Sequence, residues 1–376
     1  MNASRNRKLV VAQLTGGNDY LNCVIPYNDP LYVDNRPNVR ITEDRVIPIE
    51  NGYGFNPGMK PIKELYDQGK VAVIHGVGYP EPNRSHFRSM DIWHTAEPTK
   101  LGAEGWLGNA INQMYPDGNN VVAAVNFGAG LPRALVAKGA PVASVTDLEN
   151  YGLMNHISLE GQRNVALEAF KNMYTQAIGT GPVMDFLSQT GLNALRGAEI
   201  LNTVVGKYSS SIEYAGNSFA KSMKGAAQVL QADIGTRICY AAHGTFDAHT
   251  NGIDLQEGLL RDVSGGIYDF YSDMKQHDQS DDILILMFSE FGRRVKDNGN
   301  GTDHGSGGVA FLSGDSVQGG HYGEYPSMRP DKLVEGDLEF NLDFRSLYTE
   351  ILEDWLEVEA RPVVKGEYEK VGFLRN

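Results

Sequence analysis

The sequence predicts an α/β fold, a three-layer sandwich with a mostly parallel central sheet. Short apolar runs rich in β-branched residues recur along the chain, and Gly-rich loops follow most of them. Amphipathic helical stretches lie between these runs. Strand, loop and helix repeated in this order are typical of a buried parallel sheet covered by helices. Ligands of such folds bind at the carboxyl ends of the strands.

The expected strands and helices alternate along most of the chain. The strands are KLVVAQL (8–14), KVAVIH (70–75), VVAAVNF (121–127), RICYAA (237–242), DDILILMF (281–288) and VAFL (309–312). The clearest helical stretches are SHFRSMDIWHTA (85–96), GLLRDVSGGIYDFYSDMKQ (258–276) and RSLYTEILEDWL (345–356). The segment 150–235 is helical in pattern with few strand signals. We interpret it as a helical insertion that covers the sheet or the site, within a single domain spanning residues 1–376.

Composition and charge restrict the class of protein. The chain has 376 residues, 41% of them apolar, which is enough for a sizeable core. Lys and Arg number 33 against 47 Asp and Glu, a formal charge of −14, and no basic run is long enough to follow a phosphate backbone. The longest apolar run, ILILMF, is far shorter than the roughly 20 residues that cross a bilayer. Neither nucleic acid nor a membrane is therefore an expected partner.

The start of the chain, MNASRNRKLVV, enters a strand with no visible export signal. The expected location is the cytoplasm or, for the mature form of an exported protein, the periplasm. The oligomeric state stays open at this stage.

Cysteine usage limits the chemistry of any metal site. The two cysteines, Cys23 and Cys239, lie far apart and form neither a disulfide framework nor a thiolate metal motif. A metal site in this chain would therefore consist of imidazole, carboxylate and hydroxyl groups.

Two loops pair an acid with an imidazole. The Gly-rich loop NGNGTDHGSGG (298–308) contains Asp303 and His304 with little else. GTFDAHTNG follows the strand RICYAA and contains Asp247 and His249, whose side chains share one side if the segment is extended. Such pairs also occur by chance. At the carboxyl ends of strands, however, they indicate metal ligands.

Three further loops contribute candidates. Asp19 follows the first strand in LTGGNDYLN, where a turn or helix cap is the plainer reading. Ser85 opens a helix in NRSHFRSMDIW and could be a simple N-cap. The helix dipole and the flanking Arg84 and Arg88 also favour an anion at the Ser85 oxygen. His321 lies in a late turn, GGHYGEYP.

A parallel sheet would gather these loops along one edge. The candidate ligands are Asp19, Ser85, Asp247, His249, Asp303, His304 and His321. Carboxylate oxygen and imidazole suit one or two divalent ions of the Zn or Mn type. Two ions about 4 Å apart can stabilise both the attacking and the leaving oxygen of a displacement at phosphorus. MFSEFGRR supplies supporting residues around this site, namely Ser289, Glu290, Arg293 and Arg294.

The order of these motifs resembles the alkaline phosphatase superfamily. More closely, the chain resembles the bacterial family of unknown function numbered 1501 within that superfamily. The similarity rests on LTGGNDYLNCVIPYNDPLY, GVGYPEPNRSHFRSMDIWHT, GWLG, FDAHTN, SEFGRR, NGTDHGSGG and DFRSLYTEILEDWL, which cover nearly the whole chain. The resemblance implies an alkaline-phosphatase-like fold. Members of the family often have a twin-arginine export signal, and no such signal is present here.

The resemblance also implies roles for the candidate residues. One metal would bind Asp19, Ser85, Asp303 and His304, with the Ser85 oxygen as nucleophile. A second would bind Asp247, His249 and His321. Arg84, Arg88 and Arg294 would contact the substrate anion, with Arg88 beside Ser85 as a catalytic residue. Only Ala248 separates Asp247 from His249, a shorter spacing than the superfamily usually has, so a one-metal site is an alternative.

The sequence thus predicts a metal-dependent hydrolase of phosphate esters, a phosphomonoesterase or phosphodiesterase with a serine nucleophile and a small anionic substrate. Two alternatives stay open: a non-catalytic protein that binds an anion or a partner, and a sulfatase-like hydrolase. SHFRS lacks the C/S-x-P/A-x-R pattern of sulfatases that mature a formylglycine, which disfavours that type of sulfatase.

Overall fold

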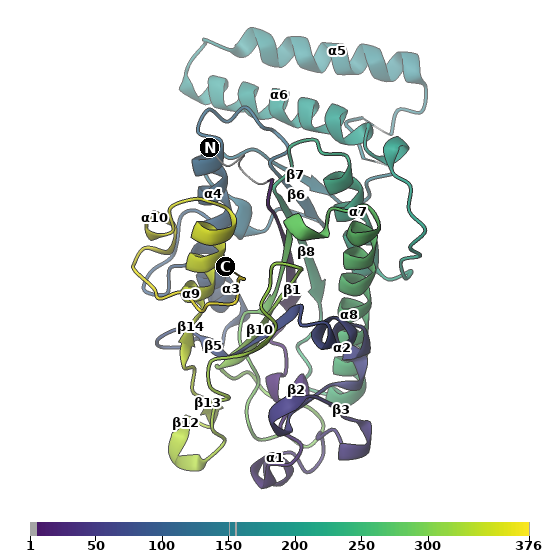
Figure 1. The fold of residues 1–376 in the computed structure, drawn as a ribbon. Helices are drawn as coiled ribbons and strands as arrows, with labels where there is room; N and C mark the ends of the chain where they lie inside the picture. The colour runs from purple at the N-terminus through teal and green to yellow at the C-terminus, as the bar shows by residue number, and fades with distance from the viewer. Residues whose placement is uncertain (1–5, 150, 155, 376) are drawn as a thin grey trace.

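A nine-stranded sheet forms the centre of the molecule in the computed structural model, which describes residues 6–149, 151–154 and 156–375 (Figure 1). The strand order is β11-β5-β10-β9-β1-β8-β6-β7, with β14 beside β5. Only β10 runs antiparallel to its neighbours. The strands are β1 (Lys8–Thr15), β5 (Val71–Gly78), β6 (Ala124–Phe127), β7 (Val142–Val145), β8 (Ile238–Gly244), β9 (Ile283–Ser289), β10 (Gly308–Ser313), β11 (Gly320–Tyr322) and β14 (Leu342–Asp343).

Two small sheets flank the central one at its lower end in Figure 1. One pairs β2 (Val24–Ile25), β4 (Gly54–Phe55) and β3 (Ile47–Pro48), and the other pairs β12 (Leu333–Val334) with β13 (Asp337–Leu338).

Helices cover both faces of the central sheet (Figure 1). One layer holds α2 (Lys60–Asp67), α7 (Ser218–Gln231) and α8 (Gly252–Gln276). The other holds α3 (His86–Thr95), α4 (Trp106–Met114), α9 (Phe344–Glu350), a π-helical turn (Ile351–Trp355) and α10 (Arg361–Val364). The remaining helices are α1 (Pro30–Asn35), α5 (Glu160–Ala177) and α6 (Pro182–Asn202).

Residue alternation along the strands builds the two cores. In β1, Val10, Ala12 and Leu14 face the layer of α2, α7 and α8, whereas Leu9 and Val11 face the layer of α3, α4 and α9. The run has no polar face because both sides of a central parallel strand are covered. The predicted three-layer α/β fold and all six predicted strands are confirmed.

The segment 150–235 contains helices and no strand among its described residues. Its last helix, α7, packs on α8 in the helical layer over the sheet. The hairpin of α5 and α6 lies at the end of the molecule opposite β12 and β13 (Figure 1). A search of the described residues finds no helix long and apolar enough to span a bilayer.

The carboxyl ends of β1, β5, β8 and β9 meet at one edge of the sheet, because these strands are parallel. The antiparallel β10 begins at the same edge. The loops that contain the candidate residues 16–19, 84–88, 247–249 and 303–304 therefore lie next to one another, as the sequence predicts.

Candidate metal centre

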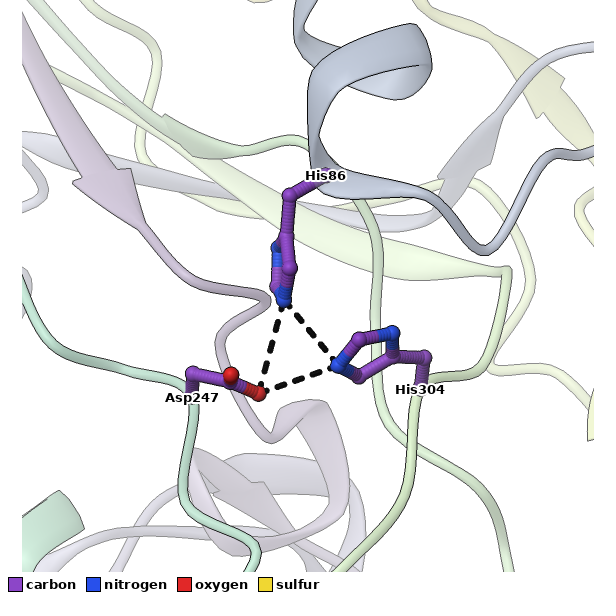
Figure 2. A group of neighbouring side chains, drawn as sticks. All are labelled: His86, Asp247 and His304. Carbon is purple, nitrogen blue, oxygen red and sulfur yellow. Dashed lines mark hydrogen bonds and ion pairs between the residues drawn. The ribbon is translucent and has the colours of Figure 1, made fainter.

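Three side chains from separate loops converge at this edge. His86 begins α3, Asp247 follows β8, and His304 lies in the loop between β9 and β10. Their ligand atoms all lie within 4.8 Å of one another. Figure 2 shows them pointing at a common centre: His86 Nε2 is 3.0 Å from His304 Nε2, and Asp247 Oδ1 is 3.4 Å and 3.0 Å from these two atoms.

His249 contacts the same group of atoms. Its Nε2 is 3.0 Å from Asp247 Oδ1 and 3.0 Å from His304 Nε2. The group of ligand atoms that all lie close to one another is His86, Asp247 and His304, and His249 contacts two of these three. Imidazole nitrogen and carboxylate oxygen are typical zinc ligands.

The outer nitrogen of each imidazole is hydrogen-bonded to an oxygen. His304 Nδ1 donates to the carbonyl of Arg84 at 2.8 Å, because a carbonyl oxygen can only accept. His86 Nδ1 is 2.8 Å from Glu290 Oε1, and His249 Nδ1 is 3.1 Å from Asp303 Oδ1. With Nδ1 as the protonated atom, each neutral ring directs the lone pair of Nε2 toward the cluster.

In this neutral tautomer the Nε2 lone pairs face one another and Asp247 Oδ1, whereas a ring protonated at Nε2 would donate across the same contacts. The neutral arrangement is repulsive unless a proton or a cation lies at the centre. Zn–N and Zn–O bonds of about 2.0–2.1 Å with tetrahedral angles give ligand separations of about 3.3 Å. The separations of 3.0 to 3.4 Å among His86, Asp247 and His304 lie around this value, so these three residues fit a divalent metal.

Arg293 holds the loops of the cluster together. Its side chain is fully buried, and its Nη2 donates to Asp247 Oδ1 at 2.6 Å. Its guanidinium also donates to four backbone carbonyls, those of Gly16, Gly17, Phe246 and Thr302. One cation therefore ties together the loops after β1, β8 and β9.

Charges around the cluster keep its acids ionised. Burial by itself raises the pKa of Asp247, but the hydrogen bond and charge of Arg293 outweigh it and lower that pKa to about 2. Hydrogen bonds from Asn298 and His249 lower the pKa of Asp303. The hydrogen bond to Glu290 raises the pKa of His86. The buried Glu290 also accepts from the backbone N–H of Gly16 at 2.9 Å.

Two glycines allow the loops to approach this closely. Gly16 has φ +120°, and a Cβ there would lie 2.5 Å from the backbone nitrogen of Asp247. A Cβ on Gly301 would lie 2.3 Å from the carbonyl oxygen of Ala248. The glycines of LTGGND and NGNGTDHGSGG thus bring the backbones together beneath the cluster.

The family model for a protein of unknown function, DUF1501, matches residues 74–353, more than half of the chain. The chain belongs to this family. The match includes His86, Asp247, His249 and His304, so the candidate metal centre of this DUF1501 protein lies inside it, and the predicted family is confirmed. No curated protein matches the chain.

Solved structures that the DUF1501 chain resembles include three from bacteria. A putative sulfatase from Bacteroides thetaiotaomicron has TM-score 0.43 and 10% identity over 97% of this chain and 76% of that chain. A protein in the alkaline phosphatase superfamily from Vibrio parahaemolyticus has TM-score 0.38 and 10% identity over 86% of this chain and 63% of that chain. The C-terminal periplasmic domain of EcEptC from Escherichia coli, in complex with Zn, has TM-score 0.41 and 9% identity over 95% of this chain and 83% of that chain.

Ser85 lies directly beside the cluster of this DUF1501 protein. The carbonyl of Arg84 accepts from His304, and His86 is a member of the cluster, so both chain neighbours of Ser85 contact it. Ser85 is exposed at the N-cap of α3, and its hydroxyl makes no capping hydrogen bond. The plain N-cap interpretation therefore does not describe this side chain.

Asp19 lies outside the cluster because it binds Arg36, a contact that the spacing of residues in the sequence does not reveal. Its carboxylate forms two hydrogen bonds with the buried Arg36, at 2.7 and 3.0 Å. Arg36 in turn donates to the carbonyls of Arg294 and Val295. Asp19 thus supports the loop that follows Arg293, and it does not belong to the group of possible metal ligands found among the described residues.

His321 is also placed outside the cluster. It lies on β11, where its Nδ1 is 2.6 Å from Nε2 of the buried His75 and its Nε2 is 2.9 Å from the Tyr66 hydroxyl. His75 Nδ1 is 2.6 Å from the hydroxyl of Tyr20. The second ligand set expected from Asp247, His249 and His321 is therefore not assembled.

The His75–His321 pair gives a testable dependence of stability on pH. Burial, followed by the charge of His321, lowers the pKa of His75 to about 3, and burial lowers the pKa of His321. In the unfolded chain both histidines bind protons near pH 6.5, whereas in the folded chain they do so only at lower pH. The stability that they contribute is therefore full above pH 6.5 and falls as the pH decreases. Between pH 7 and pH 5, the free energy of unfolding measured with urea should decrease by about 2 kcal/mol more in wild type than in His75→Gln. The exposed control His156→Gln should follow wild type, and equal losses in His75→Gln and wild type would contradict the assignment.

Neither Arg88 nor Arg84 is free to bind a substrate. Arg88 donates to Asp91 at 2.7 Å and to three carbonyls in residues 97–100, so its guanidinium already has partners. Arg84 forms ion pairs with Asp337 at 2.7 Å and Glu335 at 3.0 Å. Arg294 is more available, since its ion pair with Asp337 is 3.8 Å long.

His86 is the site residue that the sequence analysis did not select as a ligand. It follows Ser85 directly, at the start of a helix. An imidazole in the first helical turn after a parallel strand is the signal that could have identified it, because that turn lies at the ligand-binding edge.

Proposed function

We propose that the protein is a metal-dependent hydrolase of phosphate esters, with the Ser85 oxygen as nucleophile. The observation that supports it is the convergence of His86 Nε2, His304 Nε2 and Asp247 Oδ1, with His249 Nε2 against the last two, while every Nδ1 contacts an oxygen. Histidine rings oriented by carboxylates and carbonyls are characteristic of metal sites. The side chains are one quarter to nearly one half exposed, so a small anionic ester can reach them.

His86, His304 and Asp247 would hold the ion, with His249 as a fourth ligand. When bound, a divalent metal such as Zn or Mn supplies positive charge that favours an ionised hydroxyl and stabilises negative charge developing on the ester. Glu290, Asp303 and the Arg84 carbonyl fix the three rings, so the ligands need little reorganisation on binding.

Ser85 is the nucleophile that we assign to this centre, because both of its chain neighbours contact the cluster. Its side chain is exposed and makes no capping hydrogen bond, so it can form a bond to phosphorus while the bond to the leaving group breaks. The hydroxyl proton passes through solvent to the departing alkoxide. The first N–H groups of α3 point toward the same end of the helix and can bind the phosphate oxygens. Water would then release phosphate from the serine.

Two groups near the cluster shape the substrate side. The centre of the Phe291 ring lies 4.9 Å from that of His86 and 5.2 Å from that of His304. Phe291 therefore forms an apolar surface on one side of the cluster. Arg294 follows Arg293 directly and can supply a positive charge for an anion. Arg294, rather than Arg88, is therefore the cation that we assign to substrate binding.

Replacement of Ser85 by alanine tests this function. On an aryl phosphate or aryl phosphodiester, Ser85→Ala should lower kcat by about a thousandfold or more, because the covalent step is lost. Metal content should stay at the wild-type value, since Ser85 is exposed and is not one of the candidate metal ligands. The exposed Ser327, outside the site, provides the control Ser327→Ala, which should keep full turnover.

Three results would contradict the proposal. Undiminished turnover in Ser85→Ala would show that water or another residue attacks the ester. Turnover of an aryl sulfate but not of the phosphate esters would assign the site to sulfate esters. A protein that binds metal but hydrolyses neither would match the binding-protein alternative.

A further inference from the structure

The hairpin of α5 and α6 exposes an unusual amount of apolar surface. Of the fourteen large hydrophobic side chains exposed in the described part of the chain, eight lie between residues 159 and 187. Several are exposed by 60% or more, including Val165 at 72% and Val183 at 69%. We call these eight side chains the hairpin surface: Leu159, Val165, Met173, Ile178, Val183, Met184, Phe186 and Leu187.

On α6 the hairpin surface lies on the first turns of the helix. Further along, Leu195 and Ala198 are buried and line a cavity together with Leu167 of α5, so α5 covers this side of α6. Val183 and Phe186 are three residues apart and share another side of the helix. They are exposed by 69% and 60%. An apolar face of this kind requires a cover.

The outer helix, α5, lacks a second neighbour. Its main contacts are with α6 (Figure 1), and no residue of α5 in the described part of the chain is buried. Val165, Ala169 and Met173 are spaced four residues apart and therefore form one exposed stripe along it. A two-helix hairpin with bare apolar stripes is half of a four-helix bundle.

Charge favours a second copy of this chain as the cover. The segment 159–202 has three basic and four acidic residues, a net charge of −1, whereas the whole chain carries −14. Two copies of an acidic chain repel each other less when they meet at a segment whose own net charge is close to zero. The hairpin also lacks the excess of Lys and Arg that attracts proteins to anionic membranes.

The hairpin is also large enough to form a stable interface. Helices of 18 and 21 residues are about 27 and 31 Å long, and the pair is about 20 Å wide. A face of that size, once its side chains interdigitate, is of the order of the roughly 800 Å² per partner that stable interfaces bury.

We propose that the hairpin surface docks onto the same surface of a second copy, so that two α5–α6 hairpins form a four-helix bundle. The dimer interface would lie at the end of the molecule opposite β12 and β13, away from Ser85 and the metal ligands. Dimerisation through this surface is independent of the proposed hydrolase function.

Light scattering coupled to gel filtration, from about 1 to about 100 µM, tests the docking. Wild type should be a dimer. Val165→Glu and Leu187→Glu should each weaken dimerisation at least about a hundredfold, since each dimer would bury two carboxylates in an apolar interface. Val334→Glu, at an exposed valine on β12, should dimerise as wild type does. Both hairpin positions are exposed in the single chain, and a wild-type circular dichroism spectrum would verify that the variants fold.

Three results would overturn the proposal. One is a wild-type monomer at the highest concentration, and another is a dimer that both hairpin variants retain. The third is a monomer that binds phosphatidylcholine vesicles through Val165 and Leu187, which would identify a membrane as the cover.

Discussion

Replacement of His304 by alanine should abolish tight metal binding. His304 Nε2 contacts each of the other three ligand atoms, at 3.0 Å in every case, so its removal opens the centre of the cluster. The affinity for Zn or Mn, measured by calorimetry with a competing chelator, should fall by about a thousandfold or more. Hydrolysis of a phosphate ester should fall with it. His304 is partly exposed, so the variant should still fold.

A change at Asp303 should weaken metal binding less than the change at His304. Its carboxylate orients His249 from outside, so Asp303→Asn should weaken metal binding by only about 10- to 100-fold. The exposed His156 provides a control, and His156→Ala should bind metal as wild type does. An Asp303→Asn defect equal to that of His304→Ala would contradict the division into ligands and orienting residues.

Replacement of Arg293 by methionine should cause the largest loss of stability. The change leaves four buried carbonyls without their donor and Asp247 without its cation. We expect a decrease of about 3–5 kcal/mol in the free energy of unfolding, measured by urea denaturation. Arg293→Lys should restore little, because a single ammonium cannot reach carbonyls on three loops.

An exposed arginine gives the matched control. Arg329 pairs with Asp331 two residues away, and both side chains are more than half exposed. Arg329→Met should therefore cost less than about 1 kcal/mol. An Arg293→Met variant as stable as Arg329→Met would show that Arg293 does not hold the site together.

The fold was predictable because its determinants are local. Runs such as DDILILMF and KLVVAQL are apolar on both faces, which only a covered central strand requires. Parallel strands then bring their following loops to one edge regardless of sequence distance, so Asp247, His249, Asp303 and His304 could be expected to meet. The short edge strands β11 and β14 have too few residues to show a pattern and were not predicted.

The assignment of individual ligands depended on contacts that spacing does not encode. Asp19 has the expected position after β1, but Arg36, 17 residues later, binds its carboxylate. His321 has the expected loop composition but pairs with His75 at the far edge of the sheet. Arg88 is directed toward Asp91, three residues along α3, as helix geometry favours. His86 was overlooked because a helix-start histidine has a plainer structural interpretation.

The most direct test of the metal centre is the metal content of the purified protein. The measurement is elemental mass spectrometry on wild type prepared without chelator or added metal, with His86→Ala and Asp19→Asn in parallel. We expect about one equivalent of Zn or Mn per chain in wild type, much less in His86→Ala, and retention in the folded Asp19→Asn protein, because Asp19 binds Arg36 and not the metal. No stoichiometric metal in wild type, even after incubation with Zn and Mn, would contradict the metal centre and with it the proposed hydrolase.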